Sequence, residues 1–120
     1  MEYSMRDVQG QRFIEGAPGQ QLIGQADDVR TVLEACFEHG VESLLLYPEN
    51  LTPQFFDLSS GEAGAILQKL RMYHIRVAVV RPPTQRLSHR FVELMVEENR
   101  GPYFRLFDER SAAQEWLCFG

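Results

Sequence analysis

The stretch Val-Glu-Ser-Leu-Leu-Leu-Tyr at residues 41–47 decides the fold. Its centre, Leu44-Leu45-Leu46, is an unbroken apolar run with no polar face. A strand with one solvated face alternates apolar and polar residues, whereas a central parallel strand is covered on both faces and is apolar throughout. We therefore expect residues 41–47 to form a central strand in a sheet that carries helices on both faces.

Helical spacing on either side of this stretch supports that expectation. Before it, Asp27 and Asp28 are candidate N-caps, Gly40 is a stop signal, and apolar residues recur at i, i+3, i+4, i+7 and i+8; these are Val29, Val32, Leu33, Cys36 and Phe37. After it, residues 59–62, Ser-Ser-Gly-Glu, fit a capping box. The helix that follows is predicted to end near residue 73, with one apolar stripe made of Ala63, Ile66, Leu67, Leu70 and His74.

The remaining elements complete an alternation of strands and helices. Residues 1–8 and 12–15, parted by residues 9–11, predict a hairpin, and Leu22-Ile23 is expected to end a loop in contact with the core. We then expect one helical turn after Thr52-Pro53, a strand at residues 75–80, a helix capped by Ser88, and a strand at residues 103–107. A last helix is expected to be capped by Asp108 or Ser111 and to pack through Ala112, Ala113, Trp116 and Leu117.

This order of elements builds a mainly parallel sheet with right-handed crossovers. With 120 residues, 44% of them hydrophobic, the chain suffices for one core. We predict a single α/β domain over residues 1–120, with a mixed, mainly parallel sheet of about five strands, an N-terminal hairpin and about four helices.

Composition excludes several classes of function. A net charge of −5 argues against nucleic-acid binding, and the lack of an apolar run of about 20 residues argues against a membrane span. Without a signal-peptide pattern we expect a cytoplasmic protein. No glycine-rich nucleotide loop and no metal-ligand spacing occur, so no cofactor or metal is expected, and Cys36 and Cys118 are predicted to be unpaired thiols.

Charge and aromatic residues suggest association. Residues 1–68 carry a charge of −8 and residues 69–120 a charge of +3, so the two halves could face one another across an interface. An aromatic group near the C-terminus is large for a small domain and is expected to leave an exposed patch, which usually marks association; it consists of Tyr103, Phe104, Phe107, Trp116 and Phe119. We therefore expect a homodimer that pairs this C-terminal region or sets the basic half against the acidic one.

The element order, with Leu44-Leu45-Leu46 followed by Ser59-Ser60-Gly61, resembles the STAS domain of anti-sigma-factor antagonists. In that family the serine before the glycine of an Asp-Ser-Ser-Gly-Leu-Gly motif is phosphorylated by a partner kinase, and the phosphate breaks a protein–protein complex. The resemblance implies this role for Ser60. The motif departs here, because Leu58 separates Asp57 from Ser59 and Glu62 replaces an apolar residue.

The whole chain also resembles a family of short bacterial proteins, domain-of-unknown-function family 4180, which are themselves STAS-like. That resemblance implies a fold and no activity. It rests on Asn50-Leu51, residues 55–58, Gly61, residues 63–69, 73–75 and 99–101, Phe104-Arg105 and Trp116-Leu117.

Three functions remain open. We favour a non-enzymatic STAS-like regulatory module that contacts an unknown protein partner through Ser60, Ser59, Asp57, Gly61 and Glu62; the plain alternative is that these residues only cap a helix. The second is a small-molecule-binding protein with a pocket at the carboxyl ends of the strands, whose candidate ligand or anion contacts are Tyr47, Phe55, Phe56, Arg81, Arg86 and Arg90. An enzymatic function is the least favoured of the three, because the sequence offers no set of nucleophile, base and orienting group.

Overall fold

The computed structural model describes residues 3–17, 19–23, 28–51, 62–80 and 103–119. Five strands form one sheet in the order β1-β2-β3-β4-β5. They are β1 Tyr3–Val8, β2 Gln11–Gly16, β3 Ser43–Leu46, β4 Arg76–Val80 and β5 Phe104–Phe107. The β1–β2 pair is antiparallel, and all other neighbours are parallel. This architecture confirms the predicted α/β class with a mixed, mainly parallel sheet.

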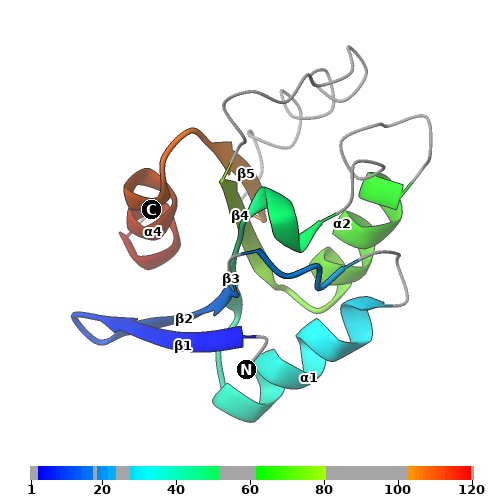
Figure 1. The fold of residues 1–120 in the computed structure, drawn as a ribbon. Coiled ribbons are helices and arrows are strands. Elements are labelled where there is room, and N and C mark those ends of the chain that lie inside the picture. The colour runs from blue at the N-terminus through cyan, green and yellow to red at the C-terminus, as the bar shows by residue number, and fades with distance from the viewer. Residues whose placement is uncertain (1–2, 18, 24–27, 52–61, 81–102, 120) are drawn as a thin grey trace.

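Helices cover both faces of the sheet (Figure 1). Helices α1 (Val29–His39) and α2 (Glu62–Met72) lie on one face, and α4 (Arg110–Phe119) lies on the other. A short 3-10 helix, η2 (Pro48–Asn50), follows β3. The predicted helix at Ser88 and the turn after Thr52-Pro53 fall outside the described residues. Among the helices that are described, none is long and apolar enough to cross a membrane.

The central strand β3 is buried on both faces, as its apolar run predicts. Leu44 and Leu46 point into the core beneath α1 and α2, and Leu45 points into the core beneath α4. Because successive side chains of a strand alternate between faces, three consecutive leucines contribute to both cores. The sheet is therefore held from both sides at its centre.

The predicted hairpin and loop anchor are confirmed. The hairpin closes through Gln9 and Gly10, which both have positive φ, so Gln11 already belongs to β2. Positive φ at both central residues is typical of a type I′ turn, whose twist matches the flanking strands. Ile23 is buried in the core and forms an isolated parallel bridge with Leu51.

Helices α1 and α2 end in the same way with different residues. In α1, Gly40 has φ 65° and the Val41 N–H donates to the Cys36 carbonyl at 3.0 Å. In α2, His74 has φ 60° and the Ile75 N–H donates to the Leu70 carbonyl at 3.0 Å. Both ends are Schellman motifs, which need a left-handed residue after the helix. The prediction of His74 in the apolar stripe of α2 is therefore wrong, and the side chain is exposed.

Several local predictions fail at the helix starts. Asp28 precedes α1, but its side chain makes no capping hydrogen bond, and Asp27 lies outside the described residues. In α4, Ser111 is already inside the helix rather than at its cap, and Ala112 is exposed. Capping depends on the dihedral angles of the residues just before a helix, and the sequence does not determine these.

The predicted aromatic patch is largely packed away. Phe104 and Trp116 are buried, and Phe119 is exposed. The guanidinium of Arg76 lies 4.3 Å from the centre of the Trp116 ring and donates to the Trp116 carbonyl at 3.2 Å. A cation there covers the ring and satisfies the last turn of α4, where the helix dipole is negative. Exposed apolar residues instead gather at α1 and α2, where Phe37 leaves its predicted place in the apolar stripe.

Candidate functional site

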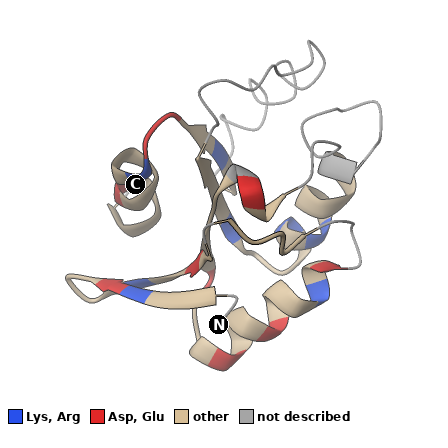
Figure 2. Cartoon of the chain, viewed as in Figure 1, with Lys and Arg blue, Asp and Glu red and all other residues tan. Residues whose placement is uncertain are grey.

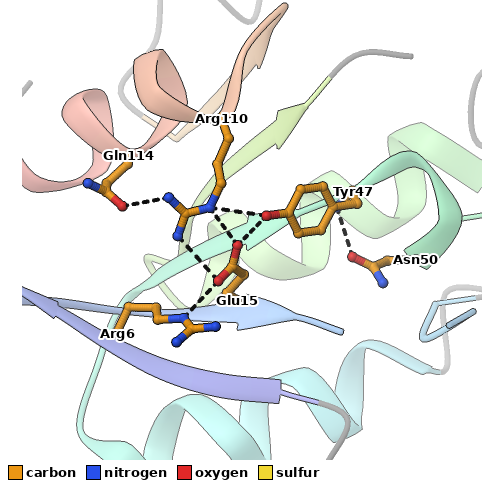
Figure 3. Close-up of polar contacts among 6 residues, drawn as sticks. All are labelled: Arg6, Glu15, Tyr47, Asn50, Arg110 and Gln114. Atoms are coloured by element: carbon orange, nitrogen blue, oxygen red, sulfur yellow. Dashed lines mark hydrogen bonds and ion pairs between the residues drawn. The ribbon is translucent and has the colours of Figure 1, made fainter. Parts of the chain in front are cut away.

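The polar centre of the described structure is the carboxylate of Glu15, on β2. Its side chain faces α4, and only 5% of the residue is exposed. Arg110, the first residue of α4, donates from Nε to Oε2 at 2.8 Å and from Nη2 to Oε1 at 3.3 Å. Arg6 donates from Nε to Oε1 at 2.8 Å, and the Tyr47 hydroxyl donates to Oε2 (Figure 3). One carboxylate thus accepts hydrogen bonds from three side chains.

The fold explains why these side chains meet. Strands β2 and β3 are parallel, with Glu15 opposite Leu45, so their carboxyl ends lie at one edge of the sheet. Tyr47 follows β3 directly. It is two residues after Leu45, so its side chain lies on the same α4 face of the sheet. Arg6 lies on β1 two residues after Ser4, the cross-strand partner of Glu15, and this places it within reach of a diagonal cross-strand contact. The site therefore ties β1, β2, β3 and α4 together.

Hydrogen bonding determines the charge of the site. Burial by itself raises the pKa of Glu15, but the hydrogen bonds from Arg110, Tyr47 and Arg6 outweigh burial and lower the pKa to about 2. Burial and the neighbouring carboxylate raise the pKa of Tyr47, and the hydrogen bond to Glu15 raises the pKa of Arg110. At neutral pH Glu15 is ionised, so it is poorly suited to general acid–base catalysis, which needs a pKa near the working pH.

A second polar side chain, the buried Asn50, closes the same edge. Its Oδ1 accepts from the Tyr47 N–H at 2.8 Å, and its Nδ2 donates to the carbonyls of Ala17 and Gln20 at 2.7 and 2.8 Å. The Cβ that an alanine would add at Gly16 would lie 2.8 Å from Asn50 Cγ. Asn50 thus fixes the loop after β2 against η2, and it requires a glycine at position 16.

Only part of the predicted site falls within the described residues. Tyr47, a predicted ligand contact, has its hydroxyl engaged by Glu15 and Arg110. Glu62 is the first residue of α2. Outside the described residues lie Asp57, Ser59, Ser60, Gly61, Phe55, Phe56, Arg81, Arg86 and Arg90. Within the described parts of the chain, no group of three or more His, Cys, Asp or Glu could hold a metal ion.

Sequence reasoning missed Glu15 and Arg110. No local signal existed, because Asp108 and Glu109 directly precede Arg110 and already supply the negative charge that favours a helix start. The pairing also joins the acidic and basic halves of the chain. The charge complementarity that suggested an interface is therefore satisfied in part within one molecule.

A groove between α1 and α2 is the second feature of interest. It has a volume of about 490 Å³ and is lined by Val29, Arg30, Leu33, Lys69, Met72 and Tyr73. Phe37 stands at its end, where its ring meets the Tyr73 ring edge-on at 6.2 Å between centroids. Phe37 is 63% exposed, Met72 67% and Tyr73 49%. Three large apolar side chains are therefore left in solvent on one face.

Fold and site together define a small α/β protein in which a closed polar cluster lies on the α4 face of the sheet and an apolar groove lies on the helical face opposite. A family model described as a domain of unknown function (DUF4180) matches residues 8–117. The chain belongs to this family. No curated protein and no solved structure matches it.

Proposed function

We propose that this protein is a non-enzymatic protein-interaction module, a STAS-like regulatory domain whose contact surface is the α1–α2 face. One observation carries the proposal: the exposed pair of aromatic rings, Phe37 and Tyr73, at the end of the α1–α2 groove. Aromatic residues and methionine are enriched in protein interfaces, and an exposed apolar patch is costly unless something covers it.

The Glu15 cluster has the properties of a structural contact and not of a catalytic acid or base. Its carboxylate is ionised and already accepts from three side chains. A group that must take up and release protons needs an intermediate pKa and a free approach. The cluster therefore acts as a structural tie. The engaged hydroxyl of Tyr47 likewise speaks against the ligand-binding alternative at the strand ends.

The regulatory part of the proposal concerns residues 57–61, which precede α2 in the sequence. Ser59 and Ser60 stand just before Glu62, where α2 begins. A phosphate there would add a charge of about −1.5 to −2 at a helix N-terminus, on the helix that carries Met72 into the groove. Phosphorylation of Ser60, with Ser59, Asp57 and Gly61 as neighbouring contact residues, is the proposed regulatory signal.

Two measurements test these claims. Tagged protein, expressed in its native cells and cross-linked, should recover a partner that the double variant Phe37→Ser, Tyr73→Ser loses. The variant Phe119→Ser is the matched control, because Phe119 is 56% exposed but lies on α4. Equal recovery by both variants would contradict the proposed surface. Intact-mass analysis under varied growth conditions tests the input, and an unmodified chain in every condition would contradict it.

A further inference from the structure

We infer that the α1–α2 face binds a second copy of this chain, as a two-fold dimer in which Phe37 of each subunit enters the groove of the other. The inference rests on the proposed function and names the partner. It follows from two adjacent features of this face that are complementary in shape and charge: an apolar groove edged by cations and an apolar projection edged by carboxylates.

The groove is the receiving half. Its walls are apolar, formed by Val29, Leu33 and Met72, and its lining also includes the two cationic side chains Arg30 and Lys69. An occupant that fits must therefore present a large apolar group with negative charge beside it.

Phe37 is the inserting half. It projects from α1 with 63% of its surface exposed. Glu34 lies one turn before it and Glu38 directly after it, and both are exposed. Figure 2 shows a basic segment near the start of α1 and acidic segments further along it. The same helix thus carries the cationic edge of the groove at one end and the acidic projection at the other.

A two-fold axis brings the two halves together. Phe37 is seven residues after Arg30, so both lie on one side of the helix. When two α1 helices pack antiparallel, Phe37 of each faces Arg30 of the other, and its flanking carboxylates meet the partner's cations. Such an interface is self-complementary, as two-fold symmetry requires. Arg30 also contacts Glu34 of its own chain at 3.9 Å, but this exposed pair is weak and easily exchanged.

The size of the face sets the strength of the dimer. An 11-residue helix is about 16 Å long, and two neighbouring helices are about 20 Å wide, so each subunit offers roughly 300–400 Å². This lies at the weak end of specific interfaces. We therefore expect reversible association with a dissociation constant in the micromolar range or above.

Sedimentation equilibrium from about 5 to about 500 µM covers the range expected for so small an interface. The wild type should shift from monomer to dimer across this range. Phe37→Ser should weaken dimerisation at least tenfold, whereas Phe119→Ser should leave it unchanged. A dimer that survives Phe37→Ser uses another surface and overturns the inference.

A charge-swapped pair gives the sharpest test. The variant Arg30→Glu, Lys69→Glu has an acidic groove and an acidic projection, and the variant Glu34→Arg, Glu38→Arg has both basic. Each alone should be monomeric, and an equimolar mixture should form a heterodimer, because each projection then meets a groove of opposite charge. A mixture that stays monomeric overturns the inference. Circular dichroism checks that both variants fold.

Failure here can be told apart from failure of the proposed function. A wild type that is monomeric at every concentration overturns the homodimer. In that case the cross-linking experiment is read separately: if wild type recovers another protein from native cells and the double variant Phe37→Ser, Tyr73→Ser does not, the α1–α2 face is still the interaction surface and binds that other protein.

Discussion

The guanidinium Nε of Arg110 lies 2.8 Å from Oε2 of Glu15, although 95 positions of sequence separate the two residues. The bond links the first residue of the last helix to the second strand. It therefore ties α4 to the sheet.

Replacing Glu15 should be costly. We expect Glu15→Gln to lower the free energy of unfolding by about 2–3 kcal/mol, because Arg110 and Arg6 lose their buried carboxylate. Chemical denaturation measures this. Glu34→Gln is the matched control, since it removes the carboxylate of the exposed pair with Arg30 and should change stability by less than about 0.5 kcal/mol. Equal effects of the two variants would contradict a structural role for Glu15.

Acid should destabilise the protein through the same residue. The pKa of Glu15 is about 2 in the folded state, against an ordinary value of 4.5. Ionised Glu15 therefore stabilises the fold above about pH 4.5, and this contribution is lost as the pH falls from 4.5 towards 2. A shift of one pKa unit corresponds to about 1.36 kcal/mol, so the lost stabilisation approaches about 3 kcal/mol. Unfolding free energies of wild type and Glu15→Gln between pH 7 and pH 2 should converge, and parallel curves would refute the assignment.

Gly16 and Asn50 should be energetically coupled. Gly16→Ala places a Cβ 2.8 Å from Asn50 Cγ, and such overpacking costs about 1–3 kcal/mol. In the double variant with Asn50→Ala the clash is gone. The double variant should therefore lose less unfolding free energy than the two single variants lose together. A double-mutant cycle measures the coupling. Gly64→Ala serves as the control, because no described atom lies within 4 Å of the added Cβ and alanine favours a helix.

The left-handed residue after α2 should prefer glycine. His74→Ala and His74→Gly both remove the contact of Nδ1 with the Tyr103 hydroxyl, so their difference isolates the backbone. Because φ is 60°, we expect the glycine variant to be more stable than the alanine variant by about 1 kcal/mol. Thermal unfolding measures the difference. Gly40→Ala should show the same penalty in α1, and an alanine variant as stable as the glycine variant would argue against this helix end.

The two cysteines should react at different rates. Both are free thiols, as predicted, and burial raises the pKa of Cys36 to about 11. Because the thiolate is the reactive form, Cys36 should react with a thiol reagent only as fast as the protein unfolds. Cys118 is half-buried and should react first. Comparing Cys36→Ser with wild type assigns the phases, and a fast native reaction of Cys36 would contradict its burial.

Much of the fold was predictable, because its signals are local. A continuous apolar run predicted β3, strongly β-forming residues predicted β4, helical spacing predicted α1 and α2, and Gly40 predicted the end of α1. Failures occurred where a residue depends on distant neighbours. Phe37 belongs to the apolar stripe of α1 by spacing, yet its side chain is exposed to solvent and meets only the edge of the Tyr73 ring among the described aromatic rings.

The candidate site was predicted only through Tyr47. Glu15 in a short strand looks like an ordinary exposed acid, since neighbouring residues carry no information about a guanidinium 95 positions away. The Ser59-Ser60 segment was singled out by a local motif, and its role stays a prediction.

The sequence by itself determined which segments are strands and helices, since hydrophobic period and helix stops act over a few residues. The tertiary structure alone decided which charges meet and which apolar side chains stay exposed. Both depend on how layers pack: α4 lies on the sheet face from which Glu15 points and brings Arg110 onto it, and the spacing of α1 and α2 leaves the groove between them open.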